Sequence, residues 1–222
     1  MMTTRLLPLA IFALLAAAGT HAATVSVIVT DKEGKPVADA VVVITPAAPG
    51  AATAAKPLPM VATVVQEKMQ FVPAVTVVPA GARVTFVNND SWEHHLRGSA
   101  AGAAQFSANP VVGGFELRLD GKPASQPGKS AEVTMGKPGP VLLGCHIHGS
   151  MKGYIYVADS PWTMKTTAEG QAVFDDIPNG TAQVRVWHGE QLVDLPASTV
   201  TAGAGTARLA VQLPFITRKR RV

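Results

Sequence analysis

Short runs of β-branched and aromatic residues recur along the chain and constrain its fold more than any other feature of the sequence. Apolar residues alternate within many runs, as at Val25, Val27 and Val29, which is typical of strands with one buried face. Turn-forming residues, as at 31–34 and 178–180, separate the runs. The sequence therefore predicts an all-β fold of antiparallel sandwiches, with strands near 25–30, 41–45, 61–66, 75–78, 83–88, 115–119, 131–135, 141–144, 154–157, 172–174, 183–187 and 206–213.

Residues 1–22 have the features of a secretory signal peptide. Arg5 supplies a positive charge, residues 6–18 are apolar, and Thr20-His21-Ala22 fits a cleavage site. We therefore expect an exported protein, periplasmic or secreted, and a retained N-terminal anchor is the alternative. No other segment reaches the roughly 18 apolar residues of a membrane span, so we expect no stable membrane insertion.

The rest of the chain is mildly basic. Removal of the leader takes away Arg5 and no acid, so the formal net charge falls from +4 to +3. Basic residues crowd the end at 218–221, and such a cluster is usually a solvated tail. We expect a basic tail at 216–222 that an anionic surface or an acidic partner could bind, and we expect no nucleic-acid recognition.

The Ala- and Pro-rich composition of residues 46–59 predicts an extended linker. The block at 60–159 then forms one domain, with the linker itself at 47–59. The pieces at 23–46 and 160–215 each have too few strands for a stable sandwich. We predict that they join into one discontinuous domain around the inserted block; three small consecutive modules are the alternative.

Two motifs characterise the flanking pieces. Residues 24–45 contain Asp31-x-x-Gly34-x-Pro36-Val37, and residues 163–188 contain Phe174-x-x-Ile177-Pro178-x-Gly180. Together they resemble the carboxypeptidase-regulatory-like domain. The resemblance implies an immunoglobulin-like β-sandwich.

The only cysteine of the chain lies in the run Gly144-Cys145-His146-Ile147-His148-Gly149-Ser150-Met151. One cysteine in an exported protein cannot form an internal disulfide, and a free thiol is a hazard there unless a metal or a partner holds it. A thiolate, an imidazole and a thioether at C-x2-H-x2-M spacing are ligand types of a blue-copper site, which also needs a second histidine. The stretch 86–96 contains His94 and His95 and can supply it.

Longer phrases carry a family resemblance. Gly81-x-x-Val84-x-Phe86-x-Asn88-x-Asp90-x-x-x-His94 resembles the cupredoxin strand and loop that deliver the first histidine, and Cys145-x-x-His148-x-x-Met151 resembles the short ligand loop of amicyanin-like members. With the phrases at 70–73 and 186–188, the chain resembles periplasmic methylamine-utilisation-type cupredoxins from about residue 24 to 188. This implies a Greek-key β-sandwich inserted in, or adjacent to, the regulatory-like sandwich. It also implies one type 1 copper ion with the ligands His94, Cys145, His148 and Met151.

The other histidines leave alternatives open. Adjacent strand residues point to opposite faces, so only one of His94 and His95 should be a ligand; the spacing from Asp90 favours His94. His146 should face solvent, although it could tune the site or bind a second metal weakly. His188 should be structural.

Other chemistries fit this donor set less well. Zinc accepts Cys and His, but Met is not among its usual ligands. A nucleophilic pair of Cys145 and His148, oriented by Asp90, is conceivable but gives Met151 no role. We therefore do not expect an enzyme.

The leading interpretation is a soluble carrier of single electrons. Its partner would be a quinoprotein dehydrogenase, a cytochrome c or a copper oxidase, by family resemblance. Electrons would pass through the exposed edge of His148 within an apolar patch, for which Ile147 and Pro110 or Val111 are candidates. The alternatives are a copper-binding carrier or sensor, and a cell-surface interaction module with an accessory metal site.

Overall fold

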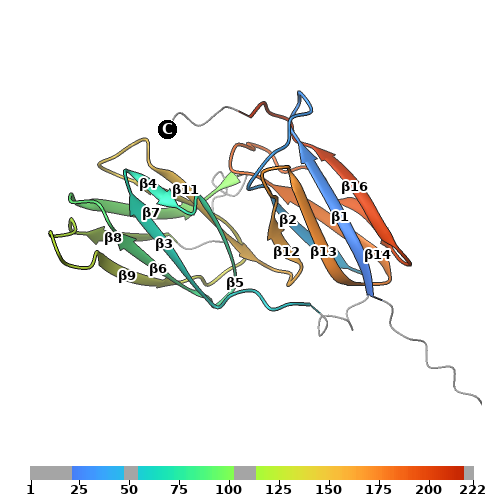
Figure 1. Cartoon of the computed structure of the whole chain (residues 1–222), viewed down its shortest axis with the longest axis horizontal. Helices are drawn as coiled ribbons and strands as arrows, with labels where there is room; N and C mark the ends of the chain where they lie inside the picture. Colours follow the sequence, from blue (N-terminus) through green and yellow to red (C-terminus); the bar gives the residue numbers. More distant parts are fainter. Residues whose placement is uncertain (1–21, 48–54, 103–113, 218–222) are drawn as a thin grey trace, which may run out of the picture.

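The computed structural model describes residues 22–47, 55–102 and 114–217, and in these ranges the chain is built from β-strands (Figure 1). The all-β prediction is confirmed. No helix in the described ranges is long and apolar enough to cross a bilayer. The strands are β1 Ala22–Thr30, β2 Val41–Pro46, β3 Val61–Glu67, β4 Gln70–Val72, β5 Val75–Pro79, β6 Arg83–Asn88, β7 His94–Ala100, β8 Phe115–Leu119, β9 Lys129–Thr134, β10 Gly139–Cys145, β11 Lys152–Ala158, β12 Thr163–Lys165, β13 Gln171–Pro178, β14 Gly180–Trp187, β15 Ser198–Ala202 and β16 Thr206–Gln212.

The central part of the chain forms a sandwich of two sheets. One sheet has the order β5-β11-β10-β7-β8, and the other has the order β4-β3-β6-β9. Strand alternation sends one face of each sheet inward, where Phe71, Phe86, Leu96, Leu143 and Ile155 are fully or almost fully buried. This core holds the strands that position the candidate site.

The two ends of the chain form a second sandwich together. Its sheets have the orders β13-β1-β16 and β12-β2-β14-β15. Strand β1 pairs antiparallel with β13 and parallel with β16, while β2 lies between β12 and β14. The chain thus leaves this sandwich after β2 and returns to it at β12. The domain boundaries and the carboxypeptidase-regulatory-like assignment of this sandwich stay predictions, and residues 48–54 of the expected linker lie outside the described ranges.

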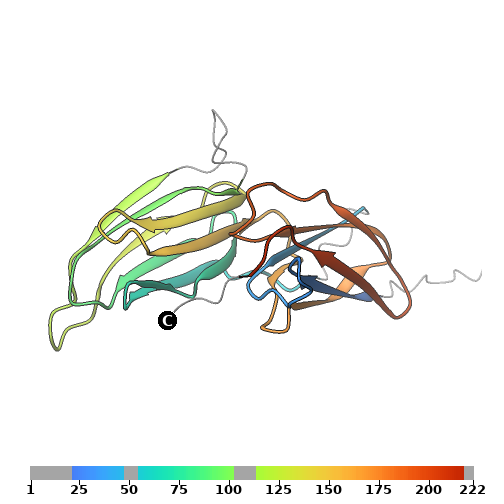
Figure 2. The ribbon, with the colours of Figure 1, turned by 90° about the horizontal axis from the view of Figure 1, so that it is seen from above.

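The two sandwiches lie against each other (Figure 2), and a small apolar cluster packs between them. Trp187 from β14 lies against Tyr154 and Tyr156 from β11, with ring centroids 5.2 and 5.6 Å apart. The hydroxyl of Tyr154 donates a hydrogen bond to the carbonyl of Gly189 at 2.8 Å. The outer face of β11 is therefore covered by the second sandwich.

Four strands were not expected from the sequence: β4, β7, β12 and β15. Strand β7 matters most because it carries His94. Its sequence, HHLRGSA, contains no β-branched residue, so propensity gives no signal there. Pairing with β8 on one side and β10 on the other holds it in the sheet.

Candidate metal centre

The cysteine side of the site is the turn between β10 and β11. Cys145 ends β10, lies opposite Leu96 of β7 and is 7% exposed. Alternation along β10 directs Val141, Leu143 and Cys145 into the same core. Residues 146–151 then return the chain to β11. The thiol is thus held at one end of the core.

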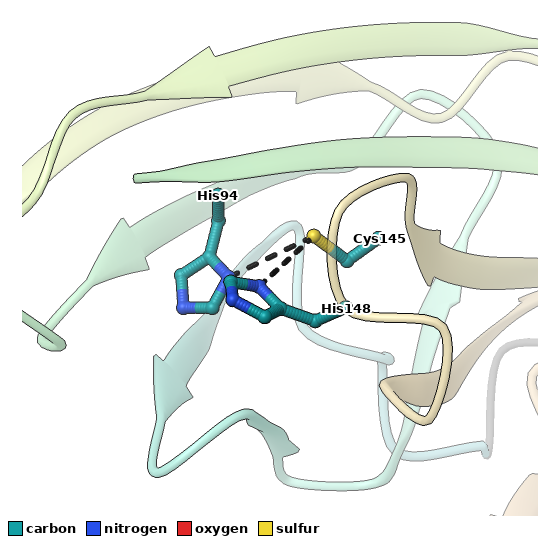
Figure 3. Close-up of side chains that lie close together, drawn as sticks. All are labelled: His94, Cys145 and His148. Atoms are coloured by element: carbon teal, nitrogen blue, oxygen red, sulfur yellow. Dashed lines mark hydrogen bonds between the residues drawn. The ribbon is translucent and has the colours of Figure 1, made fainter. Parts of the chain in front are cut away.

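Two imidazoles converge on this sulfur (Figure 3). His94 begins β7 and is fully buried, and its Nδ1 lies 3.7 Å from Sγ of Cys145. His148 comes from the turn, and its Nδ1 lies 3.6 Å from the same sulfur. The two Nδ1 atoms are 3.1 Å apart. The structure therefore brings together the donor atoms of three of the four residues that were predicted to be ligands.

These spacings fit a single shared metal ion. Metal bonds in proteins are about 2.0 Å to imidazole nitrogen and about 2.3 Å to thiolate sulfur. Ligand angles between tetrahedral and trigonal then place two nitrogens about 3.3–3.5 Å apart, and nitrogen and sulfur about 3.5–3.7 Å apart. The observed values of 3.1, 3.6 and 3.7 Å are close to these. The residues present fit a metal that accepts thiolate and imidazole.

Met151 ends the turn. It is 3% exposed and belongs to the same core cluster as Cys145. Its amide donates a hydrogen bond to the carbonyl of His148 at 2.9 Å, which keeps the turn tight. A buried thioether is the donor that a weak axial position uses in blue-copper sites. The binding of copper by these four residues stays a prediction, developed below.

Asp90 orients the first histidine. Its Oδ2 lies 2.9 Å from Nε2 of His94, and the amides of Lys68 and Met69 donate to its two oxygens at 2.6 and 3.1 Å. Burial raises the pKa of Asp90. The hydrogen bonds lower it by more, that from His94 most of all, so the pKa lies below its ordinary value. An ionised carboxylate accepts the Nε2 proton, so the lone pair of His94 is at Nδ1, which faces Cys145.

Asn88 ties together the segments around this histidine. Its Nδ2 lies 2.8 to 3.1 Å from the carbonyl oxygens of Trp92, Leu119 and Asp120, and its Oδ1 accepts the amide of Asp90 at 2.9 Å. It is fully buried. Asn88 and Asp90 are members of the sequence motif, and the spacing from Asp90 favoured His94. Their long-range contacts, to Lys68, Met69, Leu119 and Asp120, depend on which segments meet in space and had no local signal.

The other histidines of the described ranges lie outside this site. His95 and His146 lie beside each other and near Glu116, with the two rings 4.6 Å apart. His188 lies in the second sandwich, where its ring stacks on Phe215 at 4.9 Å. Burial is the main cause that lowers the pKa of His188.

The sequence profile of the copper-binding plastocyanin/azurin family matches residues 59–158. Residues 59–158 belong to this family. The segment is a cupredoxin domain, and its cofactor is one copper ion.

Solved structures similar to the chain include amicyanin from Paracoccus versutus, with 18% identity over 52% of this chain and 97% of that one and a TM-score of 0.34. A copper-containing nitrite reductase from Thermus scotoductus SA-01 has 30% identity over 52% of this chain and 25% of that one, with a TM-score of 0.34. A purple cupredoxin from Nitrosopumilus maritimus has 18% identity over 44% and 99%, with a TM-score of 0.31. None of the curated proteins matches the chain.

The geometry also bears on the nucleophile alternative. That arrangement needs Asp90 to orient His148 as the base for Cys145. In the cupredoxin domain the Asp90 carboxylate accepts from His94 instead, and both imidazoles direct Nδ1 toward the sulfur. The arrangement therefore favours metal binding by all three groups.

Proposed function

We propose that the chain carries single electrons through one type 1 copper ion held by His94, Cys145, His148 and Met151. The observation that carries the proposal is the convergence of Sγ and two Nδ1 atoms within 3.7 Å at one end of a buried core. Bound copper supplies a one-electron couple between Cu(I) and Cu(II). The protein does not transform a substrate in this proposal.

The side chains have distinct roles in holding the ion. Cys145 would contribute the soft thiolate, His94 and His148 the two imidazole nitrogens, and Met151 a weak thioether donor. Asp90 keeps His94 in the tautomer that exposes Nδ1. A site built on strand ends and one tight turn is rigid, so little reorganisation accompanies the change of oxidation state.

We also propose that electrons enter and leave at His148. This side chain is partly exposed, and its neighbour Ile147 is 54% exposed. An exposed apolar residue beside a partly exposed ligand suits the small, transient contacts of redox partners. The proposed partner is a quinoprotein dehydrogenase, a cytochrome c or a copper oxidase in the periplasm or outside the cell. Pro110 and Val111, the other candidates for this patch, lie outside the described ranges.

An optical and redox titration of the mature protein tests this function. Addition of Cu(II) should produce an intense thiolate-to-copper band that disappears on reduction and returns on reoxidation. Cys145→Ser should abolish the band, while the control His188→Gln, in the second sandwich, should retain it. A band unchanged by Cys145→Ser would refute the assignment. Copper that binds without reversible cycling would support the carrier or sensor alternative instead.

A further inference from the structure

A second group of donor side chains lies on the outer face of the five-stranded sheet. It consists of His95 on β7, Glu116 on β8 and His146 directly after β10. Nε2 of His146 lies 3.4 Å from Oε1 of Glu116, and Nε2 of His95 lies 3.6 Å from Oε2. One donor atom from each residue lies within 4.8 Å of the others.

Strand geometry holds these residues together. Adjacent strand residues face opposite sides of a sheet, so His95 faces outward where His94 faces inward. The amide of His146 donates to the carbonyl of His95 at 3.0 Å, which fixes the two backbones side by side. The side chains of His95, His146 and Glu116 are 25%, 39% and 58% exposed, so a dissolved ion has access to all three.

Two arginines flank the cluster. Arg118 lies opposite His95 in the ladder, and its Nε lies 3.6 Å from a carboxylate oxygen of Glu93, which balances its charge in part. Arg97 lies opposite Glu116 and competes with a cation for that carboxylate. We therefore expect a site of moderate affinity.

We propose that His95, Glu116 and His146 bind a divalent transition-metal ion at a site separate from the cupredoxin copper. Two imidazoles and one carboxylate suit Zn²⁺, Ni²⁺ and Cu²⁺, with Cu²⁺ the tightest. The donor atoms, which lie within 4.8 Å of one another, have to move closer together to form bonds of about 2.0–2.2 Å to one ion. Solvent completes the coordination.

The chain links this site directly to the first one. His95 follows His94, and His146 follows Cys145. A dication at the outer cluster therefore adds positive charge next to the cupredoxin copper and favours its Cu(I) form, so its reduction potential rises. This consequence, unlike the binding itself, depends on the proposed electron-transfer function.

Calorimetric titration of Zn²⁺ into the mature protein loaded with one equivalent of copper tests the site, because that copper blocks the first centre and leaves the second one open. We expect one equivalent of Zn²⁺ to bind. His146→Gln should weaken binding at least about tenfold, and so should Glu116→Gln. Glu132→Gln, an exposed glutamate on β9 of the other sheet, should leave it unchanged. No heat of binding to the unaltered protein, or equal affinity in His146→Gln, would overturn the proposal.

The optical band of copper distinguishes a failure of the second metal site from a failure of the electron-transfer proposal. All variants used here leave the four proposed copper ligands in place and should retain the band, which also shows that they are folded. A protein that binds Zn²⁺ as described but lacks the band supports the second site and contradicts the electron-transfer proposal.

Discussion

Replacing Asp90 by Asn tests how far one carboxylate controls the copper site. The carboxylate accepts three hydrogen bonds, from Nε2 of His94 and from the amides of Lys68 and Met69. Asparagine keeps one oxygen and presents an amide NH₂ group in place of the other. If that group faces His94, Nε2 must accept a hydrogen bond and the ring proton moves to Nδ1, the atom that faces Cys145.

The magnitude follows from these contacts. A hydrogen bond to a charged group contributes about 1.5–3 kcal/mol, and a buried donor left without an acceptor costs about 1–3 kcal/mol. We expect Asp90→Asn to lower the free energy of unfolding of the cupredoxin domain by about 2–4 kcal/mol. When a ligand histidine loses the carboxylate that accepts its second ring proton, metal binding weakens about 10- to 100-fold. If the affinity for Cu(II) falls by this factor and the affinity for Cu(I) does not, the reduction potential rises by about 60–120 mV.

Spectroelectrochemical titration of the blue band measures this potential. The matched control is Glu93→Gln, which also removes one negative charge next to His94 but whose carboxylate lies by Arg118. The control should shift the potential much less than Asp90→Asn, because its charge is exposed and screened by solvent. Equal shifts in the two variants would show that charge alone acts. An unchanged or lower potential in Asp90→Asn would refute the reasoning.

Three further predictions concern stability, and thermal unfolding followed by circular dichroism checks each. In Gly153→Ala the new Cβ would lie 2.8 Å from Cβ of Phe71, so the free energy of unfolding should fall by about 1–3 kcal/mol and the melting temperature should fall with it; an unchanged melting temperature would contradict this. Hydrogen bonds from Thr217 lower the pKa of Asp31 from 3.8 to about 2. The ionised carboxylate therefore stabilises the folded chain above pH 3.8, and this stabilisation is lost as the pH falls toward 2. The difference in melting temperature between the parent protein and Asp31→Asn should narrow over that pH range. Burial lowers the pKa of His188 from 6.5, so the folded chain loses stability as the pH falls below 6.5. The melting temperature of His188→Gln should fall less over the same pH range. An identical pH profile in the two proteins would argue against this effect.

The sequence allowed the prediction of the all-β class and of the cysteine turn because both depend on local patterns. Alternation identifies strands, and C-x2-H-x2-M is contained in one short run. Strand β7 escaped notice because long-range pairing, rather than β-branched residues, forms it. The roles of Asp90 and Glu116 depend on which strand ends and faces meet in space, and spacing along the chain does not encode that. Strand alternation limited the ligand to one of His94 and His95, and the spacing from Asp90 favoured His94; the burial of His94 agrees with that choice.

Strand β11 links the copper site physically to the second sandwich. Ile155, on one face of the strand, packs in the cupredoxin core, while Tyr154 and Tyr156, on the other, lie against Trp187. A cupredoxin domain alone would expose that tyrosine face to water. Because β11 begins directly after Met151, packing on both faces fixes the end of the ligand turn. The second sandwich thus adds rigidity to the site, and rigidity is what rapid one-electron exchange requires.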